Sequence, residues 1–562
     1  MPTKKAGGYI SRMAFNDGTC LNIKKNDIVV FVGPNNVGKS QSLKDIYYLS
    51  GNNASGKIVS NITVAKHPSP ISETLSTLSV GDDQGRCVKY NVLGETYNVF
   101  DFTDGRYLEL ADHGDYRDLF VANLNTSARL TICDPPRSVS RNEMKKHPIH
   151  YAAFDKRYRK WLSENYKKAF DEEVIPNIHY GATIPLCIGA PVKLDGEYED
   201  EQERQEAFSE ILDGYKQVQN QGDGIKSFTG ILLYLMLDHF CTYLIDEPES
   251  FLHPPQAHIM GQIIGQTLTD EQQAFISTHS EDIIKGLLDV CPDRIKIIRI
   301  TRAHDENKFS VLENDKFHDV WSDPLLKYSN IMSSLFHKSV VLCESDSDCR
   351  IYSVVESYLK QIDGKYSETL FIHCGGKHRM AKIITALRAL NIPVKLVPDI
   401  DVMNDSSVFQ GIIEAFGMEW SDIQKDYNVV VSNLHSAKET IKRSEAKTII
   451  NGILEASKAQ DLSSKEIKSI QDAVRTISKW DGLKKGGTAT LPAGDATKSF
   501  KTMDKKLREH GIFLVPVGEL ECFIKEVGGH GPEWANKVLE NYPDLGDDVY
   551  KDVKDFIASL NL

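Results

Sequence analysis

The stretch 28-IVVFVGPNNVGKS-40 places a run of apolar residues directly before a glycine-rich loop, and 42-SLKDIYYL-49 continues it with a helical pattern. A strand, a loop of the form G-x-x-x-x-G-K-S and a helix, in this order, are the arrangement that a phosphate-binding loop requires. Backbone N–H groups of the loop would surround the β-phosphate at a helix N-terminus, Lys39 would neutralise β- and γ-phosphate charge, and Ser40 would ligate Mg²⁺. The alternative is a glycine turn that matches by chance. The candidate nucleotide-binding residues of the loop are Gly33, Pro34, Asn35, Asn36, Val37, Gly38, Lys39 and Ser40.

The composition of the chain indicates the class of protein to which this loop belongs. The chain has 562 residues, enough for about three to four domains of average size or for fewer, larger α/β domains. Of these residues 26% are charged and 41% hydrophobic, values typical of a soluble globular protein. The longest apolar stretches, such as 229-TGILLYLML-237, are shorter than the ~20 residues that span a membrane. Ten cysteines are scattered without a C-x-x-C pair, which favours a reducing cytoplasm. The sequence therefore predicts a cytoplasmic protein with no membrane contact.

The net charge of −13 argues against binding of nucleic acid by the whole surface. Two basic helical stretches, 155-DKRYRKWLSENYKK-168 and 498-KSFKTMDKKLREH-510, leave room for a local basic groove. Each is a solvated helix face or a DNA contact, and the sequence favours the solvated face.

Two further strand ends fit a nucleotide site. In 242-TYLIDEPESFLHP-254 an apolar strand ends in Asp246, which would hold Mg²⁺ through water, and Glu247, which would act as general base on the attacking water. In 274-AFISTHSEDII-284 a third strand is followed by His279, which would sense the γ-phosphate. Taken alone, His279 is also compatible with a core histidine at a strand end.

A glycine-rich turn opens a helix in 221-QGDGIKSFTGILLYLM-236. Its Gly222, Asp223 and Gly224 resemble the signature loop of ABC-type ATPases, although it departs from the usual LSGGQ pattern. The motifs GPNNVGKS, QGDGIKSF, LIDEPESFLHPPQ and ISTHS resemble the ATPase half of the OLD (overcoming lysogenization defect) nucleases and, more distantly, the RecF, SMC and Rad50 group. The resemblance implies that Gly224 completes the ATP site of a second protomer, and hence a homodimer or higher homo-oligomer.

The second half of the chain alternates strands with helices, a pattern typical of a parallel sheet whose ligands gather at the carboxyl ends of the strands. The segment 338-KSVVLCESDSDCRIYSVVESYL-359 carries Glu344, Asp346 and Asp348, and 369-TLFIHCGGKHRMAKII-384 adds a strand, a glycine turn and a helix. In 396-LVPDIDVMND-405 a strand over 394–401 would turn Asp399 and Asp401 to one face. Two like charges on one face favour a bound divalent cation, and a simple turn is the alternative.

Glu344, Asp348, Asp399 and Asp401 would thus meet at one edge. This order of acids resembles the Toprim domain of topoisomerases, primases and OLD nucleases, with Ser345 in the place where glycine is common. The resemblance implies a catalytic Mg²⁺ or Mn²⁺ at these carboxylates. It also implies a late acid for a second ion and a late lysine that stabilises the transition state. The candidates are Glu519 and Glu521, with Glu521 preferred, for the acid, and Lys537, with Lys525 as its rival, for the lysine.

The expected fold class is α/β, with an ABC-type ATPase domain over 1–325 and a Toprim domain over 326–562. Each domain would contain a helical insertion, at about 140–220 and about 406–500. Within the second insertion, 484-KKGGTATLPAGDATKSF-500 is expected to be a surface loop, or else a loop that contacts a phosphate backbone.

The combined resemblance implies an ATP-dependent, metal-dependent DNA endonuclease in which two ions, about 3.5–4 Å apart, act on the phosphodiester. It further implies a role in phage defence, with a partner such as a reverse transcriptase carrying retron DNA or a Gabija-type helicase. One alternative is a DNA-binding ATPase scaffold of the RecF/SMC kind whose Toprim acids are not catalytic. Another is strand passage or primer synthesis, for which no tyrosine in a topoisomerase context and no primase module is recognisable.

Overall fold

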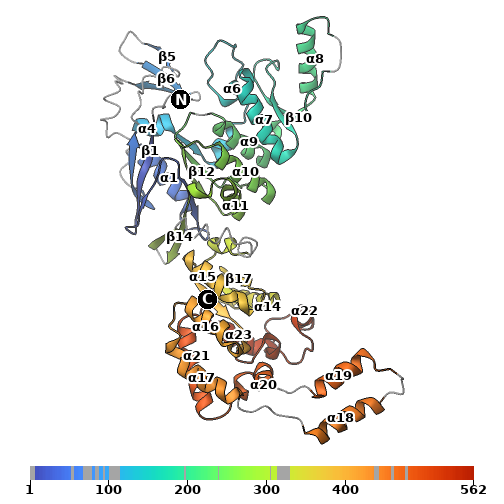
Figure 1. Cartoon of the computed structure of the whole chain (residues 1–562). Coiled ribbons are helices and arrows are strands. Elements are labelled where there is room, and N and C mark those ends of the chain that lie inside the picture. Colours follow the sequence, from blue (N-terminus) through green and yellow to red (C-terminus); the bar gives the residue numbers. More distant parts are fainter. Residues whose placement is uncertain are drawn as a thin grey trace. The chain divides into compact units, whose positions relative to one another are not determined.

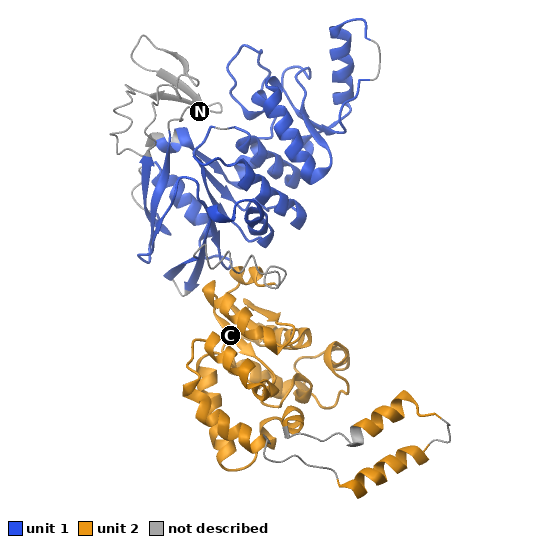
Figure 2. Ribbon diagram, in the orientation of Figure 1, with its two compact units in different colours: residues 1–323 blue, residues 324–562 orange. Residues whose placement is uncertain are grey.

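The computed structural model divides the chain into two compact units, Met1–Asp323 and Pro324–Leu562 (Figure 2). The boundary expected between residues 325 and 326 lies within 313–329, outside the described residues. The structure describes residues 7–51, 56–66, 79–82, 88–92, 95–99, 114–194, 198–237, 239–303, 306–312, 330–435, 442–456, 461–474 and 479–562. Among them, no helix is both long and apolar enough to cross a membrane.

Unit 1 is built on a six-stranded sheet in the order β15-β14-β3-β13-β12-β8 (Figure 1). Its strands are β3 (Ile28–Val32), β8 (Val121–Leu124), β12 (Thr242–Asp246), β13 (Gln273–Ser277), β14 (Ile295–Ala303) and β15 (Glu306–Leu312). All neighbours pair in parallel except β14 and β15. Because β3, β13 and β12 are adjacent and parallel, the three predicted nucleotide motifs that follow them reach the same edge of the sheet.

Helices cover this sheet, and unit 1 also contains separate three-stranded antiparallel sheets. Helix α1 packs on β12 and β13, α5 packs on α9, and α10 packs on α11. The helices are α1 (Lys39–Leu49), α4 (Gly114–Phe120), α5 (Thr126–Thr131), α9 (Asp223–Leu235), α10 (Pro254–Thr267) and α11 (Glu281–Val290), with η2 (Pro292–Arg294). One flanking sheet contains β1 (Gly8–Phe15), β2 (Cys20–Asn22) and β4 (Val59–Lys66), and another contains β5 (Ser79–Asp82), β6 (Val88–Val92) and β7 (Glu95–Val99).

The insertion expected to be helical over about 140–220 also contains a small antiparallel sheet. Its helices are α6 (Pro148–Phe154), α7 (Lys156–Phe170) and α8 (Glu201–Asp213), with η1 (Val218–Asn220), and its strands are β9 (Glu173–Pro176), β10 (Leu186–Gly189) and β11 (Lys216–Gln217). The purely helical prediction was wrong because the short apolar segments around Val174 and Ile188 are each only four residues long. These two segments pair with each other as strands. Over so few residues, periodicity does not separate a strand from a helix.

Unit 2 is built on a parallel sheet in the order β17-β16-β18. Its strands are β16 (Ser339–Cys343), β17 (Thr369–His373) and β18 (Val394–Val397), and its helices include α14 (Asp346–Ile362) and α15 (Met380–Ala389), with η3 (Met332–Phe336) and η4 (Lys377–Arg379). Residues 511–515 lie alongside β18, since Leu396 N–H donates to the Gly511 carbonyl and Phe513 N–H donates to the Leu396 carbonyl. The two units together confirm the predicted α/β class.

The core of unit 2 lies between this sheet and the C-terminal helices. Trp534, Tyr352 and Tyr550 are fully buried, and the Trp534 indole N–H donates to the Val527 carbonyl over 3.0 Å. The C-terminal elements are η7 (Leu520–Phe523), α22 (Gly531–Asn541), η8 (Asp548–Tyr550) and α23 (Lys551–Ser559).

The insertion of unit 2 follows β18. Its elements are η5 (Ile400–Asn404), α16 (Ser406–Ala415), α17 (Ser421–His435), α18 (Arg443–Glu455), α19 (Ser464–Val474), α20 (Lys479–Gly486), η6 (Gly487–Thr490) and α21 (Asp495–Glu509). The stretch 484–500 is therefore not a surface loop, because its two ends belong to α20 and α21. Apolar side chains such as Leu491 and Phe500 are buried there and fix it to the unit.

The strand expected over 394–401 ends at Val397. Pro398 follows it, and a proline has no N–H with which to continue the ladder. The chain then turns into η5, with Asp399 at its N-cap and Asp401 in its first turn. The argument that strand alternation aligns these two aspartates was therefore wrong. A tight turn places them instead.

Candidate nucleotide and metal sites

The phosphate-binding loop has a backbone that only glycine fits at its two ends. Gly33 has φ +142°, and a Cβ there would lie 2.1 Å from the Ile300 carbonyl oxygen. Gly38 has φ +98° and is the N-cap of α1, so no side chain caps the first amides of that helix. Asn36 between them also has a positive φ of 60°. The loop thus leaves a helix N-terminus available for an anion.

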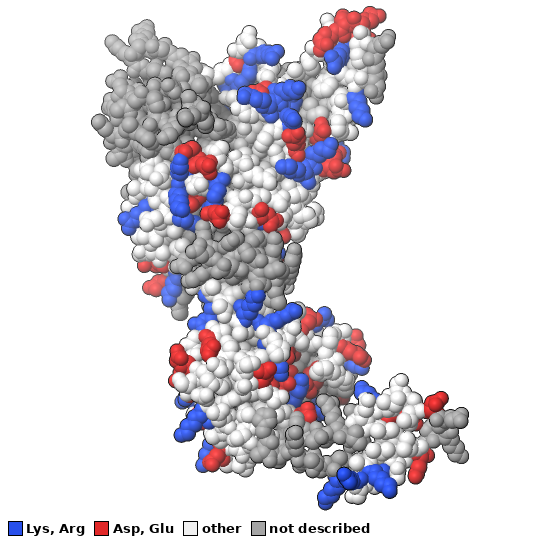
Figure 3. Space-filling model, viewed as in Figure 1, with Lys and Arg blue, Asp and Glu red and all other residues white. Residues whose placement is uncertain are grey.

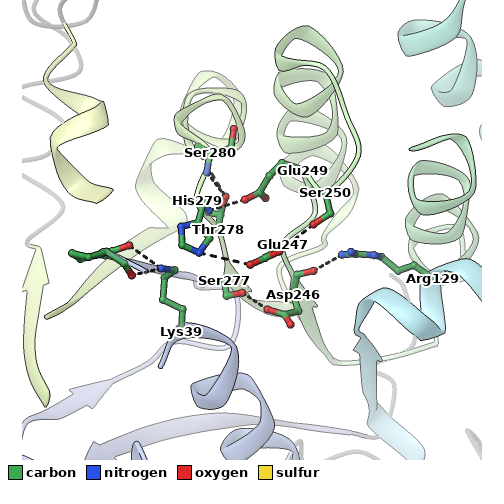
Figure 4. Close-up of polar contacts among 12 residues, drawn as sticks. Lys39, Arg129, Asp246, Glu247, Glu249, Ser250, Ser277, Thr278, His279 and Ser280 are labelled. Atoms are coloured by element: carbon green, nitrogen blue, oxygen red, sulfur yellow. Dashed lines mark hydrogen bonds and ion pairs between the residues drawn. The ribbon is translucent and has the colours of Figure 1, made fainter. Parts of the chain in front are cut away.

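Lys39 is hydrogen-bonded to the backbone of the loop (Figure 4). Its ammonium donates to the Gly33 carbonyl over 2.8 Å and to the Pro34 carbonyl over 2.7 Å. Burial lowers the pKa of Lys39 to about 8, although the neighbouring Glu247 carboxylate opposes this shift. Lys39 is therefore an already desolvated cation, which interacts strongly with any phosphate that reaches the loop.

Asp246 is held at the end of β12 by groups from two other elements (Figure 4). The Ser277 hydroxyl donates to its carboxylate, and the Arg129 guanidinium donates to its carbonyl. Arg129, on α5, is fully buried, and burial lowers its pKa. A buried charge is costly unless it is paired or hydrogen-bonded, so Arg129 fixes the strand end on which Asp246 lies.

Glu247 and His279 face each other beside Asp246. The His279 Nε2 atom is 3.7 Å from the Glu247 carboxylate, and the Ser250 hydroxyl donates to Glu247 over 3.2 Å (Figure 4). Burial lowers the pKa of His279, and the Lys39 charge lowers it further. Glu247 has φ +49°, an uncommon conformation for a non-glycine residue. Such strain is typical of functional sites, and the arrangement suits a carboxylate that orients a water molecule.

Glu249 is a member of this site that the sequence analysis missed. Its carboxylate accepts the His279 backbone N–H over 2.7 Å, and its second oxygen, Oε2, is buried without a hydrogen-bond partner among the described residues. Burial raises its pKa. Its position two residues after Glu247 was a usable signal, whereas nothing in the sequence marked Arg129.

Gly224 has a packing role within its own chain. It lies at the start of α9, and a Cβ at this position would lie 2.5 Å from the Phe251 carbonyl oxygen. Phe251 has φ +68° and an exposed fraction of 59%. The glycine at position 224 is therefore explained by packing within one subunit as well as by the predicted contact with the ATP of a second protomer. Gly222 has no atom within 4 Å of such a Cβ and is the better probe of a contact between subunits.

In unit 2, Glu344, Asp399 and Asp401 converge. One carboxylate oxygen from each lies within 4.8 Å of the others. Glu344 follows β16, and the two aspartates follow β18, which pairs with β16 in parallel so that Cys343 lies opposite Val397. The topology of the sheet thus brings together acids that are 55 or more residues apart in the sequence.

These carboxylates repel one another in a partly buried place. Burial raises the pKa of Asp399 to about 9, with the Glu344 and Asp348 charges adding to the shift. Burial and the Asp401 charge also raise the pKa of Glu344. The Glu344 Oε2 atom is buried without a hydrogen-bond partner among the described residues. An unsatisfied oxygen facing two further carboxylates fits a divalent cation such as Mg²⁺ or Mn²⁺, which prefers oxygen ligands.

Asp348 lies beside this cluster but has a structural partner. Its carboxylate accepts the Ser345 N–H over 2.8 Å, while the Ser345 hydroxyl caps the N-terminus of α14. Burial raises the pKa of Asp348 to about 6, and the charge of Glu521 contributes. Asp348 thus lies electrostatically between the first cluster and Glu521. Because one of its oxygens accepts the Ser345 N–H, Asp348 has one carboxylate oxygen left for a metal ion.

A second cluster contains Glu519, Glu521 and His530, with ligand atoms within 4.8 Å of one another. The His530 Nδ1 atom is 2.7 Å from the Glu521 carboxylate, which also accepts the Gly531 N–H over 2.7 Å. The sequence analysis singled out both glutamates and missed His530. An imidazole beside two carboxylates favours Mn²⁺ over Mg²⁺, which prefers oxygen ligands.

The structure places Lys537 and Lys484 differently from the prediction. The Lys537 ammonium pairs with Glu533 over 2.7 Å on the exposed face of α22. The Lys484 ammonium, on α20, lies 3.5 Å from Glu519 and 3.8 Å from both Asp399 and Asp401. Lys484 therefore contacts three of the predicted metal ligands, whereas Lys537 pairs with Glu533. Any helical lysine matched the sequence criterion equally well, so the sequence alone did not separate Lys537 from Lys484.

Two family models match the chain. The model described as "AAA domain, putative AbiEii toxin, Type IV TA system" matches residues 126–284, and the one described as "Overcoming lysogenization defect protein-like, TOPRIM domain" matches residues 335–401. The first match contains Asp246, Glu247 and His279, and the second contains Glu344, Asp399 and Asp401. The chain therefore carries an ATPase domain followed by an OLD-like Toprim domain, as predicted.

A curated relative is the Old nuclease of Escherichia phage P2. It is 21% identical over 328 residues, which cover 56% of this chain and 49% of the nuclease, so the match spans about half of the relative's length. Among solved structures, the SMC head bound to the C-winged helix domain of ScpA is 13% identical, with a TM-score of 0.34, and covers 55% of this chain and 99% of that one. The SMC head domain from Thermotoga maritima is 11% identical, with a TM-score of 0.28, and covers 55% and 99%.

Proposed function

We propose that this protein is an ATP-binding and ATP-hydrolysing, Mg²⁺- or Mn²⁺-dependent DNA endonuclease that acts as a homodimer or higher homo-oligomer in the cytoplasm. The observation that carries the proposal is the convergence of Glu344, Asp399 and Asp401 at one sheet edge, within the segment that matches the OLD-like Toprim model. The role in phage defence, with a partner such as a reverse transcriptase carrying retron DNA or a helicase, rests on the resemblance stated above.

In the nuclease site, Glu344, Asp399 and Asp401 would hold one divalent ion, and Glu519 and Glu521 a second, with Asp348 between them. Bound ions of this kind activate water and stabilise the leaving oxygen of a phosphodiester. The chain itself contributes the carboxylates that fix the ligand geometry. It also keeps them in a partly buried place, where charge interactions are stronger than in water.

In the ATPase site, the loop from Gly33 to Ser40 would hold the phosphates, and Ser40 and Asp246 the Mg²⁺ that accompanies ATP. Glu247 would accept the proton of the attacking water, and His279, hydrogen-bonded through its backbone to Glu249, would contact the γ-phosphate. The charges of Glu247 and Glu249 act on the Lys39 ammonium, so the cation that would bind phosphate lies close to the predicted base.

A plasmid cleavage assay with Mg²⁺ or Mn²⁺, with and without ATP, tests the proposal. We expect Asp401→Asn to abolish DNA cleavage and to leave ATP hydrolysis intact, because the replaced side chain lies in the other unit from the P-loop. Lys39→Ala is the matched control and should weaken ATP binding while leaving the carboxylates of the nuclease site unchanged.

Cleavage by Asp401→Asn at the wild-type rate would refute the nuclease assignment. DNA binding without cleavage by the wild-type protein, under every metal condition, would favour the alternative of an ATPase scaffold of the RecF/SMC kind.

A further inference from the structure

Lys484 places a positive charge among the acids of unit 2. Its ammonium lies 3.5 Å from Glu519 and 3.8 Å from both Asp399 and Asp401, and thus links the two carboxylate clusters. Lys377, on η4, is 3.9 Å from Asp401 but makes no ion pair with Asp399 or Glu519 among the described residues. Lys484 lies outside the segment that matches the Toprim model, since that match ends at residue 401.

The backbone around Lys484 is fixed to both acidic turns. A Cβ on Gly518, which has φ +109°, would lie 1.9 Å from the Lys484 carbonyl oxygen, so Glu519 follows a residue packed directly against α20. Gly487, next to α20, approaches the Pro516 carbonyl oxygen in the same way, at 2.2 Å from its ideal Cβ. Leu483 is fully buried, and α20 packs on η5, which carries Asp401. The position of Lys484 is therefore built into the unit.

The charges explain why such a residue is needed. The acids of the two clusters would repel one another strongly if all were ionised without a cation between them. Charges separated by about 4 Å attract or repel far more strongly in a partly buried place than in water. Among the described residues, Lys484 is the lysine that forms ion pairs with members of both clusters, at distances of 3.5–3.8 Å.

We propose that the Lys484 ammonium is the internal counter-cation of the metal-free carboxylate clusters and that a divalent ion must displace it in order to bind. The inference rests on the proposed function, because it takes these carboxylates to be metal ligands. The exposed fraction of the Lys484 side chain is 34%, so a rotamer change moves the ammonium to water without moving α20. Lys484 is a positioning residue, since it acts through the carboxylates and sets how tightly the site binds metal.

The experiment compares full-length wild-type protein with Lys484→Met, Lys484→Arg and the matched control Lys485→Met at pH 8. Lys485 is the exposed neighbour on the same helix, so its replacement removes one charge without touching the carboxylates. Two quantities are measured: the unfolding temperature in EDTA, and the Mn²⁺ affinity from direct titration without DNA or ATP.

We expect Lys484→Met to unfold about 2–4 °C below wild type in EDTA, because the acids lose their counter-cation. We also expect this variant to bind Mn²⁺ at least tenfold more tightly, because no cation has to be displaced. Lys484→Arg should resemble wild type in both measurements, and Lys485→Met should change neither. A residue with only a packing role would lower the unfolding temperature without tightening Mn²⁺ binding.

The inference on Lys484 is overturned if wild type and Lys484→Met bind Mn²⁺ with equal affinity, a result that leaves the proposed nuclease standing. If wild-type protein binds no Mn²⁺ at all, both the inference and the proposed metal site are overturned. Equal tightening in Lys485→Met would attribute the effect to net charge and would also contradict the specific role of Lys484.

Discussion

Replacing Asp399 with asparagine should stabilise the metal-free protein and weaken its stabilisation by metal. Burial raises the pKa of Asp399 from 3.8 to about 9, and the Glu344 and Asp348 charges contribute. At pH 7 the folded chain therefore keeps a proton that the unfolded chain releases. One pKa unit corresponds to about 1.4 kcal/mol, and the roughly three units between pH 7 and the unfolded pKa give up to about 4 kcal/mol of lost stability.

The sign follows from the raised folded-state pKa. The contribution of Asp399 is fully present below about pH 4 and is lost progressively as the pH rises toward 9. Asparagine keeps the shape and has no charge to bury, so Asp399→Asn should lose this part of the pH dependence. Wild-type protein should be stabilised by Mn²⁺ because the ion binds the folded state, whereas the variant should gain less, since only the cluster of Glu519 and Glu521 keeps all its ligands.

The assay is urea unfolding in EDTA at pH 5, 7 and 8.5, repeated with Mn²⁺. We expect the advantage of Asp399→Asn over wild type to grow from pH 5 to pH 8.5. Asp346→Asn is the control, because Asp346 lies on α14 in the same unit and pairs with Arg350 at an exposed position. A variant less stable than wild type by the same amount at each pH, or one stabilised by Mn²⁺ as much as wild type, would refute the reasoning.

Three further predictions concern unit 1. Glu247→Gln should retain ATP binding and lower the rate of hydrolysis by about two to four decades, since it removes an oriented base; unchanged phosphate release would show that the base lies elsewhere. Arg129→Met should lower the free energy of unfolding by about 1–3 kcal/mol and slow ATP hydrolysis, because the carbonyl before Glu247 loses its buried donor; a calorimetric scan and a phosphate-release assay measure both effects. Gly224→Ala should destabilise a single subunit by about 1–3 kcal/mol through its clash with Phe251, whereas Gly222→Trp, in open space, should leave the fold intact and reduce ATP hydrolysis only if that face meets a second copy. Full ATPase activity in the Gly222→Trp protein would contradict a trans role for this loop.

Sequence motifs located most of the strand ends at which the two sites form. The glycines of the P-loop, the Asp246-Glu247 pair and the two aspartates after β18 stand in short, dense patterns, because each needs a particular backbone or a repeated charge. Adjacent parallel strands then bring such groups to one edge, which is a property of the fold class and not of an individual contact.

The residues that the sequence did not reveal are those delivered by other elements. Lys484 lies about 80 residues after Asp401 and reaches it only because α20 folds back on η5. Arg129, on α5, donates to the carbonyl of Asp246, which lies more than a hundred residues later in the sequence. Neither has a local pattern, since a lone lysine or arginine in a helix is ordinarily solvated. The strand prediction failed at Pro398 for a simpler reason, because proline has no N–H with which to extend the ladder.

The surface charge also follows from particular residues. Figure 3 shows Lys and Arg side chains interspersed with Asp and Glu on the described surface in view, so that no single sign covers either unit in that view. The basic helices expected from the sequence are α7 and α21, and several of their cations are engaged locally. Arg157 pairs with Asp155 over 2.8 Å, and Arg508 pairs with Asp504 over 2.7 Å.

The insertion after β18 has two parts that differ in how closely they pack on the rest of unit 2. Helix α18 has no buried residue and packs mainly on α19, whereas α20 carries Lys484 and presses its carbonyl against Gly518. For protein engineering, this makes the pair α18 and α19 a place to attach a reporter, or to exchange for a shorter linker, without touching the acids. Helix α20 offers no such freedom, because even one added methyl group at Gly518 would push it off the turn that carries Glu519.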